Sequence, residues 1–453
     1  MDLLNTISRH SGEAVLDGVE RFDFASLERA WSAHAGRLAA AGARPGDRVG
    51  TMLADGIAAI AASLGTLALG AVHVPIDHHL TLVERDELLR RTGVAWLVDE
   101  AGIRATDLPP MPSPCRDEAF IRYTSGTTAE ARGVLLTRPA LEARVAAAAV
   151  ALRLGPGRRM LWCLPMAYHW AASILAALHA GTTIILARRP QAANIAATIR
   201  TERCDLAYAS PWHLRRLAQL PAGSLDGLVE VVSTTTAIDA QTIAQLGQTH
   251  AVRVRQALGI IELGLPLIGD GGGVGDVGWP AAGFAASIVA AEADGSGELA
   301  LRGPGMFDAY LSPAQLAGER LVEGWFRTGD RARILEDGSV RLLGRIKDLI
   351  NVAGIKVYPM EVEAVLEAHP SVSRALVYAG HDSRLGEVVA AKVVLSQPGG
   401  PAAAIVEQLR DWCRQQLQAL KCPATIEIVD SLTTTRTGKV LRGTTATPDH
   451  PSV

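Results

Sequence analysis

Cysteine is scarce in this sequence, and neither sign of charge is in clear excess. The 453 residues include five cysteines, and no two of them have the spacing of metal ligands. An odd number of scattered cysteines does not form a disulfide framework, so we interpret them as thiols of a reducing compartment and expect the cytoplasm. The formal net charge is −3. Without a basic excess, neither nucleic acid nor an anionic membrane is indicated as a partner.

The sequence also lacks the pattern of a signal peptide or a membrane helix. The first 18 residues carry charges early and contain no apolar signal core. Residues 56–76 and 160–187 are uncharged and long enough to span a bilayer, but glycine, proline and histidine interrupt both. Such runs are typical of a helix joined through glycine to a buried parallel strand, so we expect an α/β core and no membrane span.

Helical and strand patterns alternate along the chain through about residue 290. Ser26 can cap a first helix over 26–44, which ends near Gly42. The elements that follow are a helix over 57–69, a strand over 71–76, a helix over 81–92 and a strand over 94–98. This alternation predicts parallel sheets flanked by helices.

The pattern changes after residue 295, where short segments predict strands and hairpins. The last hundred residues form a pattern of their own: a helix over 360–369, strands over 374–379 and 388–396, and a helix over 401–419. Single cores stop growing at roughly 250–300 residues. We therefore predict an α/β protein with two domains: a large one, residues 1–346, with parallel-rich sheets and a β-rich subdomain, and a small α+β one, residues 347–453. The polar tail after residue 442 is expected to be disordered.

A loop rich in glycine and hydroxyl groups follows the apolar run AFIRY. It includes five consecutive candidates for phosphate binding: Thr124, Ser125, Gly126, Thr127 and Thr128. Backbone N–H groups and hydroxyls in such a loop can hold phosphate oxygens, and Arg132 adds a guanidinium group. The loop lacks the GxxxxGK[ST] pattern of kinase-type phosphate loops. Composition alone fits a polar surface loop equally well.

Four segments in order resemble signatures of the adenylate-forming superfamily, which includes acyl-CoA synthetases, peptide-synthetase adenylation domains and luciferases. They are TSGTTAEARGV (124–134), GWFRTGD (324–330), GRIKDLINVAGIKVYPMEVE (344–363) and TRTGKVLR (435–442). Weaker similarities at 45–49 and 70–77 extend the resemblance over nearly the whole chain. It implies a ligase that uses MgATP to convert a carboxylic acid to its acyl-adenylate. The acyl group then passes to the thiol of coenzyme A or of the phosphopantetheine on a carrier protein, which we expect to be a separate chain.

The resemblance also implies roles for single residues. The triphosphate would be held by the loop with Arg132, and magnesium by Glu262 and Thr128. Lys439, in the TGK turn, matches the mobile catalytic cation. Asp330 matches the ribose ligand, and Arg345 matches a nucleotide contact. Lys347 matches the hinge, and Gly354 matches the glycine beside the pantetheine arm.

Several nucleotide positions depart from the family pattern. The run aromatic–Gly–x–Thr–Glu is Leu258-Gly259-Ile260-Ile261-Glu262, so the adenine-stacking position is Leu258, beside Gly259. The Gly-Gly-Ala-Pro stretch that touches adenine is residues 234–237, with Thr235 as the candidate contact. Losing a stacking ring costs about 1 kcal/mol of affinity, and losing a hydroxyl donor about 0.5–1.5 kcal/mol. Losses of this size would weaken ATP binding without abolishing chemistry. We therefore favour an active enzyme over two alternatives, a degenerate nucleotide- or acyl-binding protein and a ligase with a non-thiol acceptor.

The segment LPMAYHWAASI (164–174) matches the place where the family sets an aromatic residue or histidine beside the substrate carboxylate. His169 is the candidate, with Tyr168 or Trp170 if the register slips by one, and a packed core histidine as the alternative. The segment has no aspartate to pair with an ammonium group, which favours an aryl or aliphatic acid over an amino acid. Trp212 and Leu258 are further candidates for the pocket.

Overall fold

The structure is a computed structural model that describes residues 3–123, 132–187, 189, 191–270, 275–382, 386–396 and 401–433. The chain forms two compact units. The large unit consists of Met1–Gly272, Val277–Ser287 and Ala300–Arg327, and the small unit of Gly273–Asp276, Ile288–Leu299 and Thr328–Val453. The predicted boundary at Lys347 lies within the small unit and stays a prediction.

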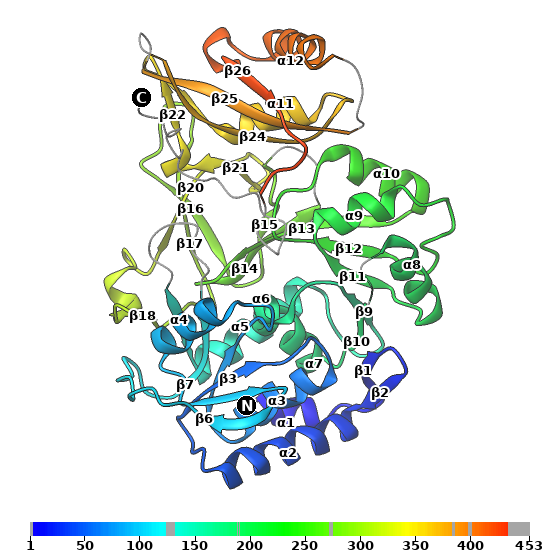
Figure 1. The fold of residues 1–453 in the computed structure, drawn as a ribbon, viewed down its shortest axis with the longest axis vertical. Coiled ribbons are helices and arrows are strands. Elements are labelled where there is room, and N and C mark those ends of the chain that lie inside the picture. The colour runs from blue at the N-terminus through cyan, green and yellow to red at the C-terminus, as the bar shows by residue number, and fades with distance from the viewer. Residues whose placement is uncertain are drawn as a thin grey trace, which may run out of the picture. The chain divides into compact units, whose positions relative to one another are not determined.

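A nine-stranded sheet forms one half of the large unit (Figure 1). Its strands, in spatial order, are β15 (Trp279–Pro280), β14 (Gly264–Asp270), β13 (Arg253–Ile260), β12 (Glu230–Ser233), β11 (Leu206–Ala209), β9 (Arg159–Trp162), β10 (Thr183–Leu186), β1 (Glu13–Asp17) and β2 (Glu20–Asp23). All neighbours from β13 to β1 pair in parallel, which confirms the predicted parallel-rich sheet. Helices α8 (Ala192–Thr201), α9 (Pro211–Ala218) and α10 (Ala240–His250) connect these strands and bury Ile195, Leu214 and Leu246 against them.

An eight-stranded sheet forms the other half. Its order is β19 (Gln315–Leu316), β18 (Ala309–Leu311), β8 (Gly133–Thr137), β7 (Glu118–Tyr123), β4 (Val72–Pro75), β3 (Arg48–Met52), β5 (Trp96–Asp99) and β6 (Gly102–Ala105). Strands β7 and β8 are antiparallel, with Tyr123 opposite Gly133. The predicted phosphate loop therefore leaves and re-enters the sheet at paired strand ends, while residues 124–131 themselves lie outside the described residues.

The helices of this half include α2 (Phe24–Ala41), α3 (Ile57–Ala68), α4 (Leu82–Thr92) and α5 (Arg138–Ala151). The prediction that Ser26 caps α2 is wrong. Asp23 is the cap, and its carboxylate accepts a hydrogen bond of 2.7 Å from the Ser26 N–H, so the helix begins two residues earlier. An ionised carboxylate at this end also complements the helix dipole. The predicted end is confirmed, because Gly42 adopts φ +109° and donates to the Ala39 carbonyl.

The small unit contains strands of two further sheets. The first has the order β16 (Ala285–Val289), β17 (Gly297–Arg302), β20 (Phe326–Ile334) and β21 (Val340–Arg345). The second has the order β23 (Ile355–Val357), β22 (Ile350–Val352), β25 (Gly386–Leu395) and β24 (Val372–Asp382), with β26 (Thr425–Ile428) also paired to β25. Helices α11 (Pro359–Glu367) and α12 (Ala402–Gln416) bury Val362, Leu366 and Leu409 in one core with this sheet. The predicted α+β pattern is thus confirmed.

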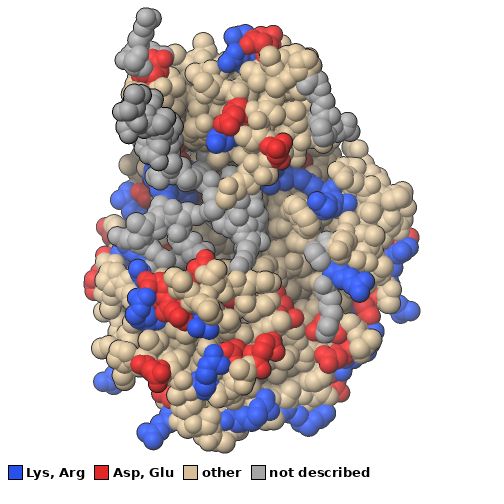
Figure 2. All heavy atoms as spheres, in the orientation of Figure 1, with Lys and Arg blue, Asp and Glu red and all other residues tan. Residues whose placement is uncertain are grey.

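The surface carries charges of both signs, and the described helices are short or polar. On the face shown in Figure 2, the described acidic and basic side chains are interspersed, in keeping with the small net charge. Within the described part of the chain, every helix is too short or too polar to cross a bilayer.

Candidate functional site

The carboxyl ends of β9, β11, β12 and β13 meet at one edge of the nine-stranded sheet. In open parallel sheets, ligands bind in the crevice outside these ends. The segment with His169 follows β9, the segment with Thr235 follows β12, and Leu258 and Gly259 lie near the end of β13. The sheet order therefore gathers three segments that are separated by up to about 90 residues in the sequence, and each of them carries a predicted site residue.

His169 ends the short helix α6 (Met166–His169), which continues as a π-helix over Trp170–Leu175. The Ser173 hydroxyl donates to the His169 carbonyl, a local bond that competes with regular helical pairing. π-turns inside helices are frequent at functional sites. This local geometry presents residues 167–169 as partly exposed, whereas Met166 and Trp170 are buried.

Aromatic rings surround the His169 imidazole. Its ring centroid lies 5.8 Å from that of Trp162 and 5.9 Å from that of Tyr208, and these two rings stack at 4.9 Å. Burial lowers the pKa of His169 to about 3, with a further contribution from the positive charge of Arg122. The imidazole is therefore neutral at pH 7, and its Nε2 is inaccessible and has no partner among the described residues. Trp170, one of the alternatives, instead packs in the core against His73, at 5.4 Å between centroids.

Thr235 has a strained backbone. Its φ is +80°, in the left-handed region where a β-branched residue is an outlier, and its hydroxyl is buried with no hydrogen-bond partner in the described structure. Thr235 replaces the second glycine of the family stretch, and it adopts a conformation that glycine reaches without strain. Strain of this kind costs about 1–3 kcal/mol and clusters at ligand sites.

Glu262 lies in the tight turn between β13 and β14, and two residues that the sequence analysis missed hold it there. The Tyr310 hydroxyl donates a hydrogen bond of 2.7 Å to Glu262 Oε1. The buried Arg144 donates through Nη1 to the Ile261 carbonyl and through Nη2 to the Glu262 carbonyl, both at 2.7 Å. Burial lowers the pKa of Arg144 to about 10, so it remains charged at pH 7. The one feature of the sequence that could have indicated Arg144 is an arginine on an alanine-rich helical face.

Arg132, at the end of the phosphate loop, lies beside this pair. Its guanidinium carbon is 5.2 Å from the centroid of the Tyr310 ring. The structure therefore brings together the predicted triphosphate arginine and the predicted magnesium carboxylate, with Tyr310 between them. The other loop candidates, Thr124 to Thr128, and the candidate catalytic Lys439 lie outside the described residues.

In the small unit, the structure brings Asp330 and Arg345 together. The two residues are opposite each other on β20 and β21, with Arg345 Nε 2.8 Å from Asp330 Oδ1. Arg345 Nη1 also donates to the Thr328 carbonyl at 3.1 Å. Asp330 is 7% exposed, and its backbone N–H donates to the Thr328 hydroxyl. The carboxylate is thus held in one orientation.

Gly354 lies in the turn of the β22–β23 hairpin. Its φ is +88°, which excludes most other residues, and its N–H donates to Asn351 Oδ1 at 3.0 Å. A Cβ at this position would meet no atom of the described residues within 4 Å. The turn is therefore open to the approach of a ligand.

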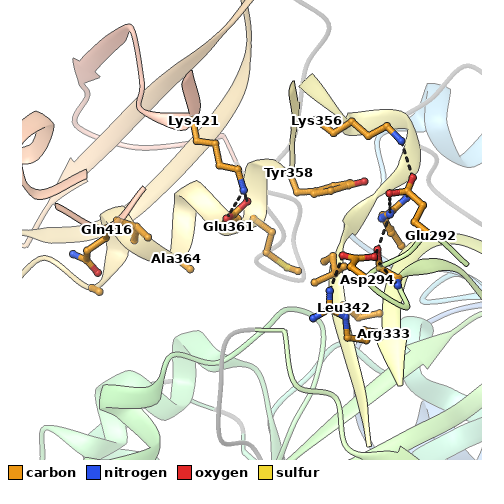
Figure 3. A pocket seen from close by; sticks show the side chains of 16 residues that line it. Glu292, Asp294, Arg333, Leu342, Lys356, Tyr358, Glu361, Ala364, Gln416 and Lys421 are labelled. Atoms are coloured by element: carbon orange, nitrogen blue, oxygen red, sulfur yellow. Dashed lines mark hydrogen bonds and ion pairs between the residues drawn. The ribbon is translucent and has the colours of Figure 1, made fainter. Parts of the chain in front are cut away.

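The small unit also contains a pocket of about 670 Å³ that holds none of the predicted substrate residues (Figure 3). Glu292 accepts there from both Arg331 and Lys356, at 2.6 and 2.7 Å, and Lys421 pairs with Glu361 at 2.8 Å. Figure 3 shows the Lys356 and Glu292 side chains pointing toward each other. These charges are satisfied by one another, so the pocket gives no sign of the reaction centre.

Comparison with known proteins places these features in context. A family model described as AMP-binding enzyme matches residues 5–109 and 99–311, and one described as AMP-binding enzyme C-terminal domain matches residues 361–439. Feruloyl-CoA synthase of an Amycolatopsis species is 28% identical, over 97% of this chain and 94% of its own. The fatty acid–[acyl-carrier-protein] ligase ScoC of Streptomyces coeruleorubidus is 29% identical, over 97% and 95%. The O-succinylbenzoate coenzyme A synthetase MenE of Bacillus subtilis, solved in complex with AMP, has a TM-score of 0.86 at 22% identity, over 97% of both chains.

Proposed function

The chain belongs to the family of AMP-binding enzymes, and from this premise we propose that it is an ATP-dependent carboxylic acid ligase. A carboxylate oxygen of the acid attacks the α-phosphorus of ATP, the bond to the β-phosphate oxygen breaks, and acyl-AMP and pyrophosphate form. A thiolate then attacks the acyl carbon, AMP leaves with the bonding electrons, and a thioester remains.

The observation that carries this proposal is the hydrogen bond between Tyr310 and Glu262 beside Arg132. A carboxylate held by a phenol, near the end of a hydroxyl-rich loop, is a donor set that suits Mg²⁺ shared with substrate phosphates. When bound, Mg²⁺ would neutralise charge on the leaving pyrophosphate. Glu262, with Thr128 of the loop, would hold it. Arg132 would contact the triphosphate, and Thr235 with Leu258 and Gly259 would flank adenine.

Residues of the small unit would take further roles toward the nucleotide. Asp330 would accept hydrogen bonds from the ribose hydroxyls, because Arg345 and the Thr328 hydroxyl hold it in place. Lys439 would place its positive charge beside the α-phosphate, where negative charge accumulates during the reaction. The small domain would turn at Lys347 between the two half-reactions.

His169 would contact the acid. Its imidazole is neutral and lies beside aromatic rings, so it can donate a hydrogen bond to the reacting carboxylate. A neutral donor forms no ion pair, which would make the carboxylate a weaker nucleophile. The rings of Trp162 and Tyr208 suit an apolar or aryl acid. The names of the two relatives, a feruloyl-CoA synthase and a fatty acid ligase, support an aryl or aliphatic acid.

The acceptor would be the pantetheine thiol of coenzyme A or of a separate carrier protein. Both relatives are named for such acceptors, one for each. The open turn at Gly354 would leave room for the pantetheine arm. All five cysteines are free, which supports a reducing compartment, the cytoplasm.

The test is ATP–pyrophosphate exchange with a panel of aryl, short-chain, medium-chain and amino acids. Exchange that depends on one class of acid would establish adenylation and identify that class. Coenzyme A and a phosphopantetheinylated carrier are then added separately, and thioester is measured by mass spectrometry. Adenylation without thioester would favour a non-thiol acceptor. Ligand binding by calorimetry without exchange at high ATP would favour a degenerate binding protein.

A further inference from the structure

Arg122 is a charged residue next to the acid-binding segment, and the mechanism above does not use it. It lies on β7, two residues before the phosphate loop. One guanidinium nitrogen, Nη1, donates to the Ala167 carbonyl of α6, and the guanidinium carbon lies 4.7 Å from the centroid of the Tyr168 ring. Its Nε is inaccessible and has no hydrogen-bond partner in the described structure. Arg122 is thus anchored at one nitrogen and unsatisfied at another.

Two buried arginines of the large unit, Arg48 and Arg144, have more partners than the partly exposed Arg122. Arg48 forms a double hydrogen bond with Glu118 on the same strand as Arg122, at 2.9 Å for both contacts. Arg144 donates to three backbone carbonyls. Arg122 has neither arrangement, since no carboxylate of the described residues forms an ion pair with it.

The guanidinium of Arg122 nevertheless carries its charge. Burial lowers its pKa to about 10, against weak support from Tyr168 and Asp77, so it is protonated at pH 7. Arg122 is partly exposed, but its Nε–H is inaccessible and unpaired among the described residues, and a buried polar group of a charged side chain is normally matched by an acceptor. An anion is therefore expected beside Arg122 in the working protein.

The position of Arg122 indicates where that anion comes from. Ala167, Tyr168 and His169 are partly exposed, and Arg122 contacts the first two of them. The charge of Arg122 also acts on His169, the residue proposed to contact the reacting carboxylate. An acid bound along this face would meet His169 and Arg122 together.

We propose that Arg122 is a specificity residue that binds a second carboxylate on the acid, and that the substrate is a dicarboxylic acid. The inference rests on the proposed function. The reacting carboxylate loses its charge when the acyl-adenylate forms, so it cannot balance Arg122 through the cycle. A second carboxylate stays anionic through both half-reactions and matches a guanidinium that stays charged.

The experiment compares acids that share a skeleton and differ in one carboxylate: pentanedioate with pentanoate, and benzene-1,3-dicarboxylate with 3-methylbenzoate. ATP–pyrophosphate exchange is measured for the wild type, Arg122→Met and Arg122→Lys. Arg138→Met is the control, because Arg138 starts a helix of the same unit and pairs with Asp117 at 3.5 Å outside the site.

We expect the wild type to favour one diacid over its matched monoacid by at least about tenfold in kcat/KM. Loss of a charge-assisted hydrogen bond predicts that Arg122→Met lowers the diacid value by roughly 10- to 100-fold and leaves the monoacid value nearly unchanged. KM for ATP should not move. If Arg122→Met does not fold, Arg122→Lys tests the same point, because it keeps the charge but not the fork and should raise KM for the diacid alone.

Two results would overturn the inference while leaving the proposed function intact. The first is exchange by the wild type that is faster with the monoacids. The second is an equal loss for both acids in the variants, which would make Arg122 only a support for α6. Absence of exchange with every acid would instead overturn the proposed function, and this inference with it.

Discussion

Tyr310 and Glu262, 48 residues apart in the sequence, are joined by a hydrogen bond of 2.7 Å from the phenol to the carboxylate. Burial and the charge of Glu262 raise the pKa of Tyr310, so the phenol keeps its proton over the physiological range and remains a donor. Tyr310 therefore orients Glu262 as a hydrogen-bond donor and does not transfer its proton to the carboxylate.

Replacing Tyr310 by phenylalanine should weaken the use of magnesium. The variant removes one hydrogen bond to a charged group and keeps the ring, a loss of about 1.5–3 kcal/mol if the bond is fully expressed in metal binding. The Mg²⁺ concentration for half-maximal pyrophosphate exchange should rise at least tenfold. Tyr378→Phe, on β24 of the small unit, is the matched control. An unchanged Mg²⁺ dependence in Tyr310→Phe would contradict the assignment of Glu262.

Thr235→Gly should stabilise the protein. A left-handed conformation costs a residue other than glycine about 1–2 kcal/mol, and glycine loses about 0.5–1 kcal/mol more entropy on folding, so a net gain of about 0.5–1 kcal/mol is expected. Urea unfolding measures it. Thr234→Gly is the control and should destabilise, because Thr234 is buried and is not among the residues of positive φ. Destabilisation by both changes would mean that the φ of Thr235 is not strained.

Leu258→Tyr should tighten ATP binding. If Leu258 occupies the adenine-stacking position, an aromatic ring there adds about 1 kcal/mol, which corresponds to roughly a fivefold lower KM for ATP. The same change at Ile260, two residues along β13, is the comparison. No difference in KM between Leu258→Tyr and the wild type would show that the alignment at this position is wrong.

Lys439→Ala should reduce adenylation by orders of magnitude and leave the fold intact. The resemblance places this lysine at the developing charge on the α-phosphate, where a single preorganised donor is worth 10²–10³ in rate. Lys421→Ala, which removes a lysine of the same unit paired with Glu361, is the control. Normal pyrophosphate exchange by Lys439→Ala would remove the catalytic role, and loss of the thermal unfolding transition would make the variant uninformative about it.

Acid should destabilise the protein through its buried histidines. His73 is 0% exposed, neither ring nitrogen has a partner in the described structure, and burial lowers its pKa to about 3. The unfolded chain binds a proton near pH 6.5 and the folded chain does not, so this contribution to stability is complete above pH 6.5 and declines as pH falls toward 3. The slope is at most about 1.4 kcal/mol per pH unit for one group.

His73→Leu should therefore flatten the pH dependence of the free energy of unfolding between pH 6.5 and 4. The measurement is urea unfolding at several pH values. His381→Leu, at an exposed position on β24, is the control for the loss of a histidine elsewhere in the chain. A slope that His73→Leu does not alter would mean that His73 is solvated or hydrogen-bonded in solution.

Neighbouring residues were enough to predict much of the fold, and they supplied the candidates for the site. The alternation of apolar helices and strands predicted the parallel-rich sheet, and Gly42 marked the end of α2. Asp330 and Arg345 were each a candidate from a separate motif, and only the structure shows that they lie opposite each other on one hairpin. The start of α2 was misplaced because Ser and Asp are both good caps, and the backbone decided between Ser26 and Asp23.

The sequence by itself determined the family and the order of its motifs, because these are carried by residues close together along the chain. Only the tertiary structure decided which distant side chains meet: Arg144 with the turn at Glu262, and Arg122 with α6. Those contacts depend on the order of strands in two sheets and on which polar groups burial leaves unpaired. The periodicity of neighbouring residues predicts neither property. For the same reason, the strain at Thr235 was visible only as a backbone angle.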